Sequence, residues 1–312
     1  MEANPLFYAK ILLFGEYGII KDAMGLSIPY NFYQGAFKNE TVLSEKSKSS
    51  NQHLLKYHAH LQALTDAGEI LSPLNLEDFK NDIANGLYFD SSIPQGFGVG
   101  SSGALVAAIY DRYAVRKIAS EGNMRREDLI ALKKIFSQME SYFHGKSSGI
   151  DPTICYLNLP LLIKSKDDLG TVQIPESTEG KGAIFLLNSG QPGETQPMVN
   201  IFMEKLKEEG FRNMLKDQFT KYNDECITSF LKGDIKPLFR SLKKLSGLLL
   251  ENFTPMIPDS FHALWKKGID SNAYYLKLCG SGGGGFILGF TRDFDKAQRI
   301  LSTHNPEVIY RF

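Results

Sequence analysis

The sequence predicts an α+β protein built from two domains. Its 312 residues are enough for two hydrophobic cores, since a single core stops growing at about 250–300 residues. Strand-like and helix-like patterns follow one another irregularly along the chain, whereas a doubly wound sheet would need regular alternation. A polar, glycine-containing stretch at 167–182 separates two apolar regions, so we divide the chain into domains at 1–175 and 176–312.

The N-terminal domain is expected to begin with a strand and to contain a long amphipathic helix. Residues 11–14 form a continuous apolar run that ends at a glycine, which is typical of a buried strand. Residues 38–52 are polar and predict a surface loop with room for a short edge strand inside it. In 126–145, apolar residues recur at spacings of three and four, so we expect a helix that ends near Gly145. The run 153–165 predicts a pair of strands.

The C-terminal domain is expected to combine strands with a helical region. The run "AIFLLNSG" at 183–190 opens with a buried strand, and residues 200–251 are helical in period. Near the end of the chain, 274–279 and 286–290 predict strands on either side of the link "GSGGGG" at 280–285.

Composition excludes several classes of partner and compartment. The 35 basic and 35 acidic residues cancel, and there is no block of Lys or Arg, so nucleic acid and anionic membranes are not expected as partners. The three cysteines lack C-x-x-C spacing, which favours a reducing compartment. No stretch approaches 18 apolar residues, and the N-terminus lacks a signal-peptide core. We therefore expect a soluble, cytoplasmic protein.

The stretch "PQGFGVGSSGA" at 94–104 lies directly before an apolar helical run and predicts an anion-binding loop. Glycine is costly to order, so this density indicates a sharp bend or a close approach to another group. The free N–H groups at the start of a helix attract anions, and phosphate is the first candidate. The G-K-[ST] ending of a Walker loop is missing. Gly98, Gly100 and Gly103 fit the spacing of a dinucleotide fingerprint, and a simple turn before a core helix also remains open.

Two further segments centre on glycine, "KILLFGEYGII" at 10–20 and "KLCGSGGGGFILGF" at 277–290. A glycine run between two strands is explained better by close approach of the backbone to a ligand than by a flexible linker. In this order and spacing, the three segments resemble those of the GHMP kinases, which include galactokinase, homoserine kinase, mevalonate kinase and phosphomevalonate kinase. The resemblance covers essentially the whole chain. It implies a two-domain GHMP kinase fold, with an N-terminal domain like domain 2 of ribosomal protein S5 and a ferredoxin-like C-terminal domain.

The stretch 94–103 resembles the phosphate loop of this family, P-x-x-x-G-x-G-S-S-A, except that Gly103 replaces the usual alanine. Glycine there weakens the helix start by up to about 1 kcal/mol and removes no N–H donor. The resemblance therefore implies that ATP is the nucleotide bound by the glycine segments. The implied ATP-binding residues are Pro94, Gly96, Gly98, Gly100, Ser101, Ser102, Gly103, Gly282, Gly283 and Gly284.

The segment "ESYFHGKSSGIDPTICY" at 140–156 resembles the mevalonate kinase stretch in which a helix glutamate is followed by H-G-x-P-S-G-[VI]-D. Ser147 replaces the usual proline, which we expect to affect the stiffness of the loop rather than the chemistry. Tyr17 stands where mevalonate kinases usually have histidine, and G-E-Y is typical of phosphomevalonate kinases. The substrate-binding residues that the resemblance implies are Glu16, Tyr17, His144, Ser148 and Thr195.

The same resemblance assigns the catalytic and metal-binding positions. Asp151 matches the catalytic aspartate, and Lys10 matches the lysine that holds it ionised. Ser102 and Glu140 match the positions that bind Mg²⁺. Each has a plain alternative: Glu140 as a solvated charge, Asp151 as a turn residue, Ser102 as a helix cap and Lys10 as a charge at the start of a strand. All four alternatives would have to hold together, so we expect the functional roles.

The sequence therefore predicts an ATP- and Mg²⁺-dependent kinase that phosphorylates the primary hydroxyl of mevalonate, giving 5-phosphomevalonate and ADP in isoprenoid biosynthesis. Phosphomevalonate kinase is the alternative, because of Tyr17. A catalytically inactive GHMP-like binding or regulatory protein is the second alternative. The expected partner is the small-molecule substrate, with no nucleic acid or membrane, and the expected assembly is a monomer or homodimer.

Overall fold

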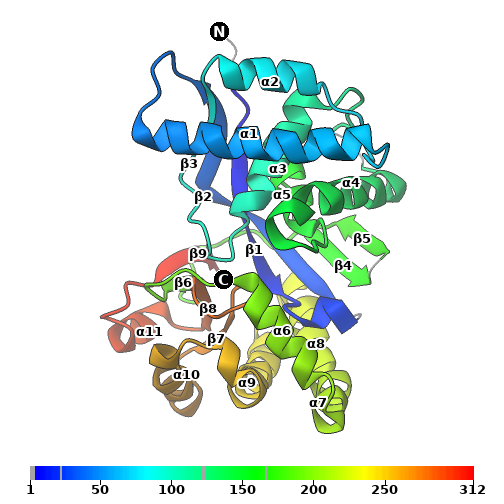
Figure 1. Cartoon of the computed structure of the whole chain (residues 1–312). Helices are drawn as coiled ribbons and strands as arrows, with labels where there is room; N and C mark the ends of the chain where they lie inside the picture. Colours follow the sequence, from blue (N-terminus) through cyan, green and yellow to red (C-terminus); the bar gives the residue numbers. More distant parts are fainter. Residues whose placement is uncertain (1–3, 22, 121–123, 166) are drawn as a thin grey trace. The chain divides into compact units, whose positions relative to one another are not determined.

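The computed structural model describes residues 4–21, 23–120, 124–165 and 167–312, which form two compact units. Unit 1 comprises Met1–Lys10, Pro29–Pro94 and Gly100–Leu159. Unit 2 comprises Ile11–Ile28, Gln95–Val99 and Pro160–Phe312. The chain passes between the units inside strand β1 (Phe7–Phe14), inside strand β2 (Gly25–Asn39), at both ends of 95–99 and after Leu159 (Figure 1). Each unit is therefore assembled from segments that are far apart in sequence.

Unit 1 combines helices with the second half of β2. Residues Gly35–Asn39 of β2 pair antiparallel with β3 (Leu87–Ser91). The helices of the unit are α1 (Glu45–Asp66), α2 (Leu76–Ala84), α3 (Ser101–Tyr113), α4 (Arg126–His144) and α5 (Ile150–Leu157). Helix α3 packs on both α4 and α5. The helix predicted at 126–145 is confirmed, and it ends at Gly145, which has a positive φ.

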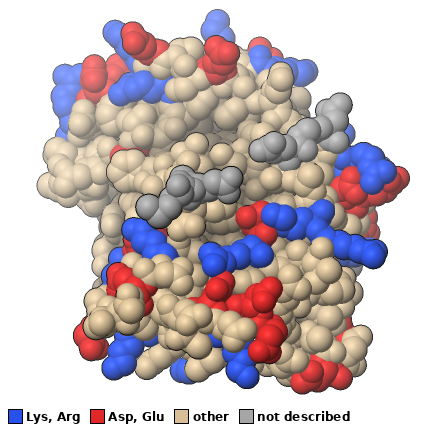
Figure 2. Space-filling model, turned by 90° about the horizontal axis from the view of Figure 1, so that it is seen from above, with Lys and Arg blue, Asp and Glu red and all other residues tan. Residues whose placement is uncertain are grey.

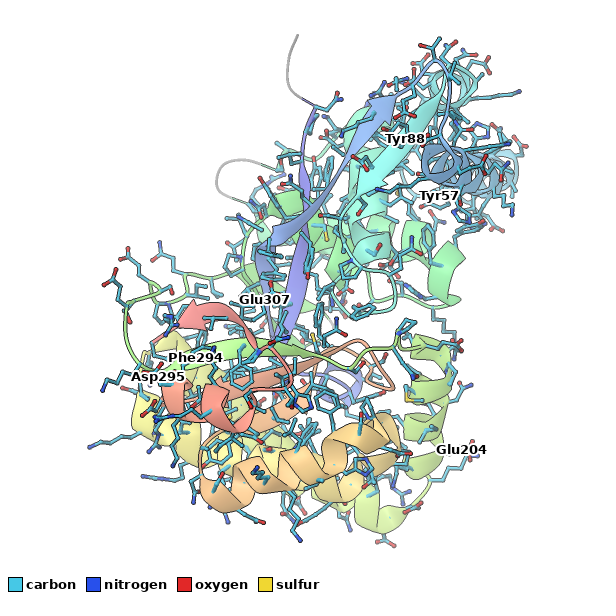
Figure 3. The ribbon with its side chains drawn as sticks, turned by 90° about the vertical axis from the view of Figure 1, so that its left-hand side faces the viewer. Tyr57, Tyr88, Glu204, Phe294, Asp295 and Glu307 are labelled. Atoms are coloured by element: carbon cyan, nitrogen blue, oxygen red, sulfur yellow. The ribbon has the colours of Figure 1, made fainter. Side chains whose placement is uncertain are left out.

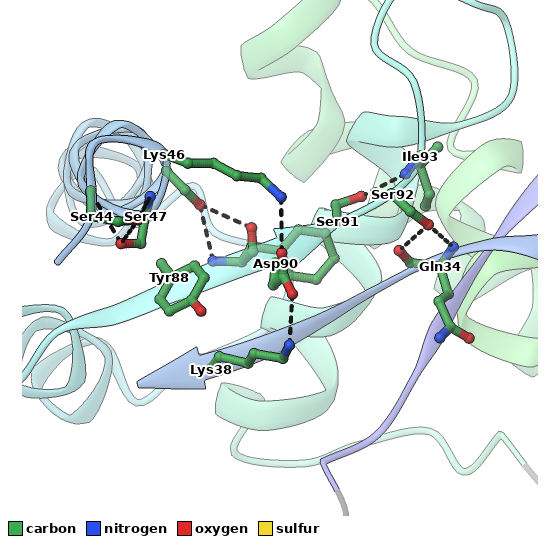
Figure 4. Close-up of polar contacts among 12 residues, drawn as sticks. Gln34, Lys38, Ser44, Lys46, Ser47, Tyr88, Asp90, Ser91, Ser92 and Ile93 are labelled. Atoms are coloured by element: carbon green, nitrogen blue, oxygen red, sulfur yellow. Dashed lines mark hydrogen bonds and ion pairs between the residues drawn. The ribbon is translucent and has the colours of Figure 1, made fainter. Parts of the chain in front are cut away.

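Polar contacts join α1 and β2 to β3 (Figure 4). Asp90 of β3 accepts hydrogen bonds from Lys38 Nζ at 2.7 Å and Lys46 Nζ at 3.2 Å. Ser44 is the N-cap of α1, and its hydroxyl accepts the N–H of Ser47 at 3.2 Å. Exposed ion pairs contribute at most about 1 kcal/mol each. The buried apolar faces of α1 and β3 therefore hold this layer together, and the polar contacts fix its alignment.

The prediction of a surface loop at 38–52 is wrong for most of its length. Strand β2 continues to Asn39, and α1 already begins at Glu45. The polar composition of this segment led to the wrong prediction because α1 buries only a narrow stripe of its surface. Apart from Ser47, its buried residues begin beyond residue 52. The first two turns therefore carry no apolar signal, although they belong to the helix.

The predicted strand pair at 153–165 is wrong in its first half. Residues Ile150–Leu157 form helix α5, and only β4 (Leu161–Ser165) is a strand. Gly149 and Asn158 flank the helix in the left-handed conformation and set its ends. Nearly every side chain of α5 is buried, so the segment lacks the polar face that marks an amphipathic helix. Its β-branched and aromatic residues then imitate a buried strand.

Unit 2 contains an antiparallel sheet in the order β7-β8-β6-β9. Its strands are β6 (Ala183–Asn188), β7 (Tyr275–Leu278), β8 (Phe286–Thr291) and β9 (Glu307–Arg311). Helices lie between β6 and β7 in the sequence, and α11 (Phe294–Ile300) lies between β8 and β9. In Figure 3, Phe294 marks α11 and Glu307 marks β9, and the Phe294 ring lies 6.1 Å from that of Phe185 on β6. This βαββαβ order is the predicted ferredoxin-like arrangement.

The remaining elements of unit 2 are mostly helical. Strand β4 pairs with β5 (Asp168–Thr171) and with residues Gly25–Ser27 of β2. The helical segments are the 3₁₀ helix η1 (Gly18–Lys21), α6 (Thr195–Lys205), α7 (Glu209–Met214), the π-helical η2 (Leu215–Phe219), α8 (Thr220–Leu231), α9 (Ile235–Asn252), the 3₁₀ helix η3 (Thr254–Met256) and α10 (Asp259–Ser271). The predicted strands and the helical region are confirmed, while the limits 1–175 and 176–312 stay a prediction.

Surface charge is mixed on the face shown in Figure 2, where acidic and basic side chains lie next to one another. Within the described ranges, no helix has the length and apolar character needed to cross a bilayer. Cys155, Cys226 and Cys279 are buried.

Candidate active site

Lys10 and Asp151 form an ion pair in unit 1. Lys10 Nζ lies 2.9 Å from a carboxylate oxygen of Asp151. The lysine side chain is 4% exposed, whereas that of the aspartate is 36% exposed. The cation is therefore enclosed by protein while the carboxylate remains reachable. A carboxylate in this position can accept a proton from an incoming hydroxyl.

Ser102, at the start of α3, contacts Glu140 in the last turns of α4. The Ser102 hydroxyl donates to Glu140 Oε1 at 2.9 Å. Glu140 is 4% exposed, so it is not the solvated charge that its place on the helix suggests. Burial raises the pKa of Glu140 to about 7, and the charge of Asp151 adds to this effect. Hydrogen bonds from Ser147 and Ser102, and the charge of Lys10, oppose the rise.

The Ser102–Glu140 pair fits a magnesium site. Magnesium binds six oxygens at about 2.0–2.1 Å, which places adjacent ligands about 2.9 Å apart. Ser102 Oγ and Glu140 Oε1 have this separation, and both are hard oxygen donors. The described residues contain no group of three or more His, Cys, Asp or Glu side chains placed to hold a metal. A site with few protein ligands suits Mg²⁺, which usually keeps several waters and binds substrate phosphates.

Two further residues contact this pair. His144 Nε2 lies 3.0 Å from Ser102 Oγ. With charged Glu140 accepting the Ser102 hydroxyl proton, this contact fits a histidine tautomer that donates its Nε2–H. Ser147 Oγ donates to Glu140 Oε2 at 2.5 Å. Sequence reasoning expected Ser147 to affect only loop stiffness and missed this contact. The glycine at 145 was the available signal, because it indicates a turn after which the chain can come back to α4.

Gly103 brings the start of α3 close to Asp151. A Cβ atom at Gly103 would lie 2.9 Å from both the carbonyl carbon of Asp151 and the nitrogen of Pro152. Real Cβ contacts are not this short, so alanine would push α5 away from α3. The glycine therefore allows Ser102 and Asp151 to lie on closely packed backbones. This steric role is separate from the weakening of the helix start that the sequence predicts.

In unit 2, three loops lie side by side: residues 95–99, the loop after β6, and the β7–β8 link. The N–H of Gly193 donates to the Gly96 carbonyl at 2.7 Å, and the N–H of Gly285 donates to the Gln191 carbonyl at 2.7 Å. The β7–β8 link is therefore an ordered part of a loop cluster and not a flexible linker. Ligand binding by Gly282, Gly283 and Gly284 stays a prediction.

The turn after β1 joins the same cluster. Glu16 Oε2 accepts a hydrogen bond from Lys277 Nζ at 2.7 Å, and both side chains are almost fully buried. Burial raises the pKa of Glu16, and the charge of Lys277 opposes the rise. The Tyr17 hydroxyl donates to the Ser281 carbonyl at 2.5 Å. Sequence reasoning missed Lys277. A single charged residue inside an apolar strand was the available signal, because such a charge needs a buried partner.

The predicted substrate residues fall into two sets. Glu16, Tyr17 and Thr195 lie in unit 2, where the Ser281 hydroxyl contacts Thr195 Oγ1 at 3.4 Å. His144 and Ser148 lie in unit 1, and Ser148 Oγ accepts the N–H of Ile150 at 3.3 Å.

The predicted nucleotide residues are divided in the same way. Gly96, Gly98 and the β7–β8 link belong to unit 2. Unit 1 contains Pro94 and the residues around the start of α3, which are Gly100, Ser101, Ser102 and Gly103. Gly100 is the N-cap of α3, and no side chain caps the first N–H groups of that helix.

Two family models assign the chain to one family of kinases. A model of the GHMP kinase N-terminal domain matches residues 63–158, and a model of the GHMP kinase C-terminal domain matches residues 226–307. Together they cover more than half of the chain, which belongs to the GHMP kinase family. The predicted α+β, two-domain fold is confirmed. Each match lies within one of the two predicted domains.

Solved structures of several GHMP kinases share this fold. The L. major mevalonate kinase in complex with R-mevalonate has 16% identity and a TM-score of 0.62, covering 97% of this chain and 91% of its own. The Streptococcus pneumoniae phosphomevalonate kinase in complex with phosphomevalonate and AMPPNP has 13% identity and a TM-score of 0.64, covering 99% and 98%. The Lactococcus lactis galactokinase complexed with galactose has 11% identity and a TM-score of 0.64, covering 98% and 93%. No curated protein matches the chain.

Proposed function

We propose that this protein is an ATP- and Mg²⁺-dependent mevalonate kinase, which transfers the γ-phosphoryl group of ATP to the primary hydroxyl of mevalonate. The observation that carries the proposal is the ion pair of Lys10 and Asp151 beside the oxygen pair of Ser102 and Glu140, all within unit 1. Phosphoryl transfer needs a base at the acceptor hydroxyl and positive charge at the phosphates. Asp151 can act as the base, and Lys10 and a Mg²⁺ ion held by Ser102 and Glu140 would supply the positive charge.

Each residue has a defined task in the proposed reaction. Asp151 accepts the proton of the hydroxyl as its oxygen attacks phosphorus, and ADP leaves with the electrons of the broken P–O bond. Lys10 holds Asp151 in place through their ion pair and stabilises the developing alkoxide. Ser102 and Glu140 hold Mg²⁺, which when bound neutralises charge on the nucleotide phosphates. The uncapped N–H groups at the start of α3 bind phosphate oxygens.

The choice of mevalonate rests on the segment 140–156 and on the supply of cations. A phosphomevalonate site must neutralise a second phosphate, which normally takes several Lys or Arg side chains. The segments that we expect to line the acceptor site are 10–21, 144–156 and 188–200, and their cations are Lys10, Lys21 and Lys146. Lys10 is paired with Asp151, and the buried Lys277 is paired with Glu16. A single carboxylate, as in mevalonate, needs fewer cations.

A coupled ADP-release assay tests the proposal with mevalonate, phosphomevalonate, galactose and homoserine as acceptors. We expect kcat/KM for mevalonate to exceed that for phosphomevalonate by at least about 100-fold. A preference for phosphomevalonate would support the alternative that Tyr17 favours. No turnover of any acceptor, with ATP still bound, would support an inactive binding protein. We further propose a cytoplasmic monomer or homodimer, and sedimentation of the purified protein would determine its assembly.

A further inference from the structure

We propose that Ser147 is a positioning residue for the metal site: its hydroxyl holds one oxygen of Glu140, so that the other oxygen is presented together with Ser102 Oγ. The inference rests on the proposed function, because that function requires a metal at Glu140. It concerns a residue that touches neither the acceptor nor the nucleotide in the proposed reaction.

The hydroxyl of Ser147 has a fixed direction. It donates to Glu140 Oε2 at 2.5 Å and accepts the N–H of Gly149 at 3.0 Å. The carbonyl oxygen of Ser147 accepts the hydroxyl of Ser137, on α4, at 2.5 Å. A serine hydroxyl has one proton to donate, and here that proton goes to the carboxylate. Contacts to α4 and to the start of α5 thus hold Ser147 from both sides.

The hydrogen bond from Ser147 fixes the orientation of the Glu140 carboxylate. Oε1 contacts Ser102 Oγ, and Oε2 contacts Ser147 Oγ, so the two oxygens have different partners. Without Ser147, the terminal torsion of the glutamate has a broad, nearly two-fold preference, and either oxygen could face Ser102. Partners that orient metal ligands in this way commonly change metal affinity or activity by about 10–100-fold when they are removed.

Ser141 provides a matched control for removal of the Ser147 hydroxyl. Ser141 lies one residue after Glu140 on α4, and its hydroxyl donates to the Gln138 carbonyl at 2.6 Å. Ser141→Ala therefore removes a hydroxyl from the same helix without touching the carboxylate. Ser147→Thr keeps a hydroxyl at the critical position, and Ser147→Val has the shape of threonine without it.

The experiment measures the dissociation constant of Mn²⁺ by electron paramagnetic resonance, with saturating ADP. Ser147→Ala should weaken Mn²⁺ binding by about 10-fold, while Ser141→Ala leaves it unchanged. Ser147→Thr should bind Mn²⁺ more tightly than Ser147→Val. Unchanged affinity in Ser147→Ala would overturn the proposal, as would equal affinities in the threonine and valine variants. If Ser147→Ala lacks the wild-type circular dichroism spectrum, the threonine and valine pair decides.

Glu140→Gln separates this inference from the proposed function. If Mn²⁺ binding does not depend on Glu140, both the metal site and the role of Ser147 are wrong. If Mn²⁺ binding depends on Glu140 and Ser147 but no acceptor is phosphorylated, the role of Ser147 stands and the kinase proposal fails.

Discussion

At the scale of single residues, the proposed chemistry depends on the half-exposed carboxylate of Asp151 and its buried partner Lys10. Asp151→Asn removes the proton acceptor and leaves the size of the side chain unchanged. We expect kcat to fall by roughly 10²- to 10⁴-fold while the affinity for ATP stays nearly the same. Steady-state kinetics and calorimetric titration with an ATP analogue measure both quantities. A variant with more than half of the wild-type kcat would rule out this role for Asp151.

The buried carboxylate of Glu140 predicts a pH dependence of stability in metal-free protein. Its pKa is raised from 4.5 to about 7, so between these values the folded protein keeps a proton that the unfolded chain releases. The contribution of Glu140 to the free energy of unfolding should therefore be highest below pH 4.5 and fall as the pH rises to about 7, by about 3 kcal/mol at most.

Urea denaturation of wild-type protein and Glu140→Gln across this range isolates the effect of Glu140. Other groups titrate in both proteins, so their difference reports the single carboxylate. A wild-type curve that runs parallel to that of Glu140→Gln would contradict the prediction.

The residues of the site differ in how readily the sequence reveals them. Ser102, Glu140 and Asp151 stand at motif spacings, so a reading of the sequence locates them and the structure brings them together. Ser147 and Lys277 act through contacts that arise only when distant backbones meet. The turn at Gly145 and the lone charge in an apolar strand mark these two positions, but neither pattern identifies the partner, so sequence reasoning overlooked both contacts.

At the scale of elements, the loop between α4 and α5 depends on a glycine that touches the helix backbone. Gly149 has a φ of +72°, and an added Cβ would lie 2.6 Å from the Ser137 nitrogen. Gly145 has a φ of +71°, but an added Cβ there meets nothing within 4 Å. The positive-φ cost is greater at Gly145, where ψ is −55°, than at Gly149, where ψ is 2°, so only the clash with the α4 backbone can make Gly149→Ala the less stable variant. We expect Gly149→Ala to lose about 1–3 kcal/mol more stability than Gly145→Ala.

Thermal unfolding of the two variants, compared with wild type, measures this difference. Similar losses of stability would show that the loop relaxes around the new methyl group. Gly149→Ala should also weaken Mn²⁺ binding, because the Gly149 N–H orients Ser147.

Secondary structure was predictable where one face of an element is buried or where a strand is apolar throughout. The helix α4 and the strands β6, β7 and β8 belong to this group. The two errors have opposite causes. The first turns of α1 bury almost no apolar side chain, whereas α5 buries nearly all of its side chains. In both cases the periodic contrast between two faces, on which the interpretation depends, is missing.

At the scale of the whole molecule, the buried pair of Glu16 and Lys277 joins two ends of the sequence within unit 2. Removing one partner of a buried pair leaves an uncompensated charge, which typically costs about 3–5 kcal/mol. Lys277→Met should therefore be strongly destabilised. The exposed pair of Lys38 and Asp90 provides the control, and Lys38→Met should lose at most about 1 kcal/mol.

Urea unfolding at pH 7 measures both losses of stability. The double variant Glu16→Gln/Lys277→Met should recover part of the loss, because no charge is then left unpaired. Equal stabilities of Lys277→Met and Lys38→Met would contradict the role of the buried pair.

The pair of Glu16 and Lys277 can form only late in protein synthesis. Glu16 and Lys277 are separated by 261 residues, and a ribosome adds about 5–20 residues per second. Roughly 13–50 s therefore pass between the translation of the glutamate and that of its partner. During this interval the nascent chain cannot bury the turn after β1 next to its counter-charge. A chain that terminates before residue 277 keeps that carboxylate unpaired, so premature products should be exposed to chaperones and proteases in a way that the full-length protein is not.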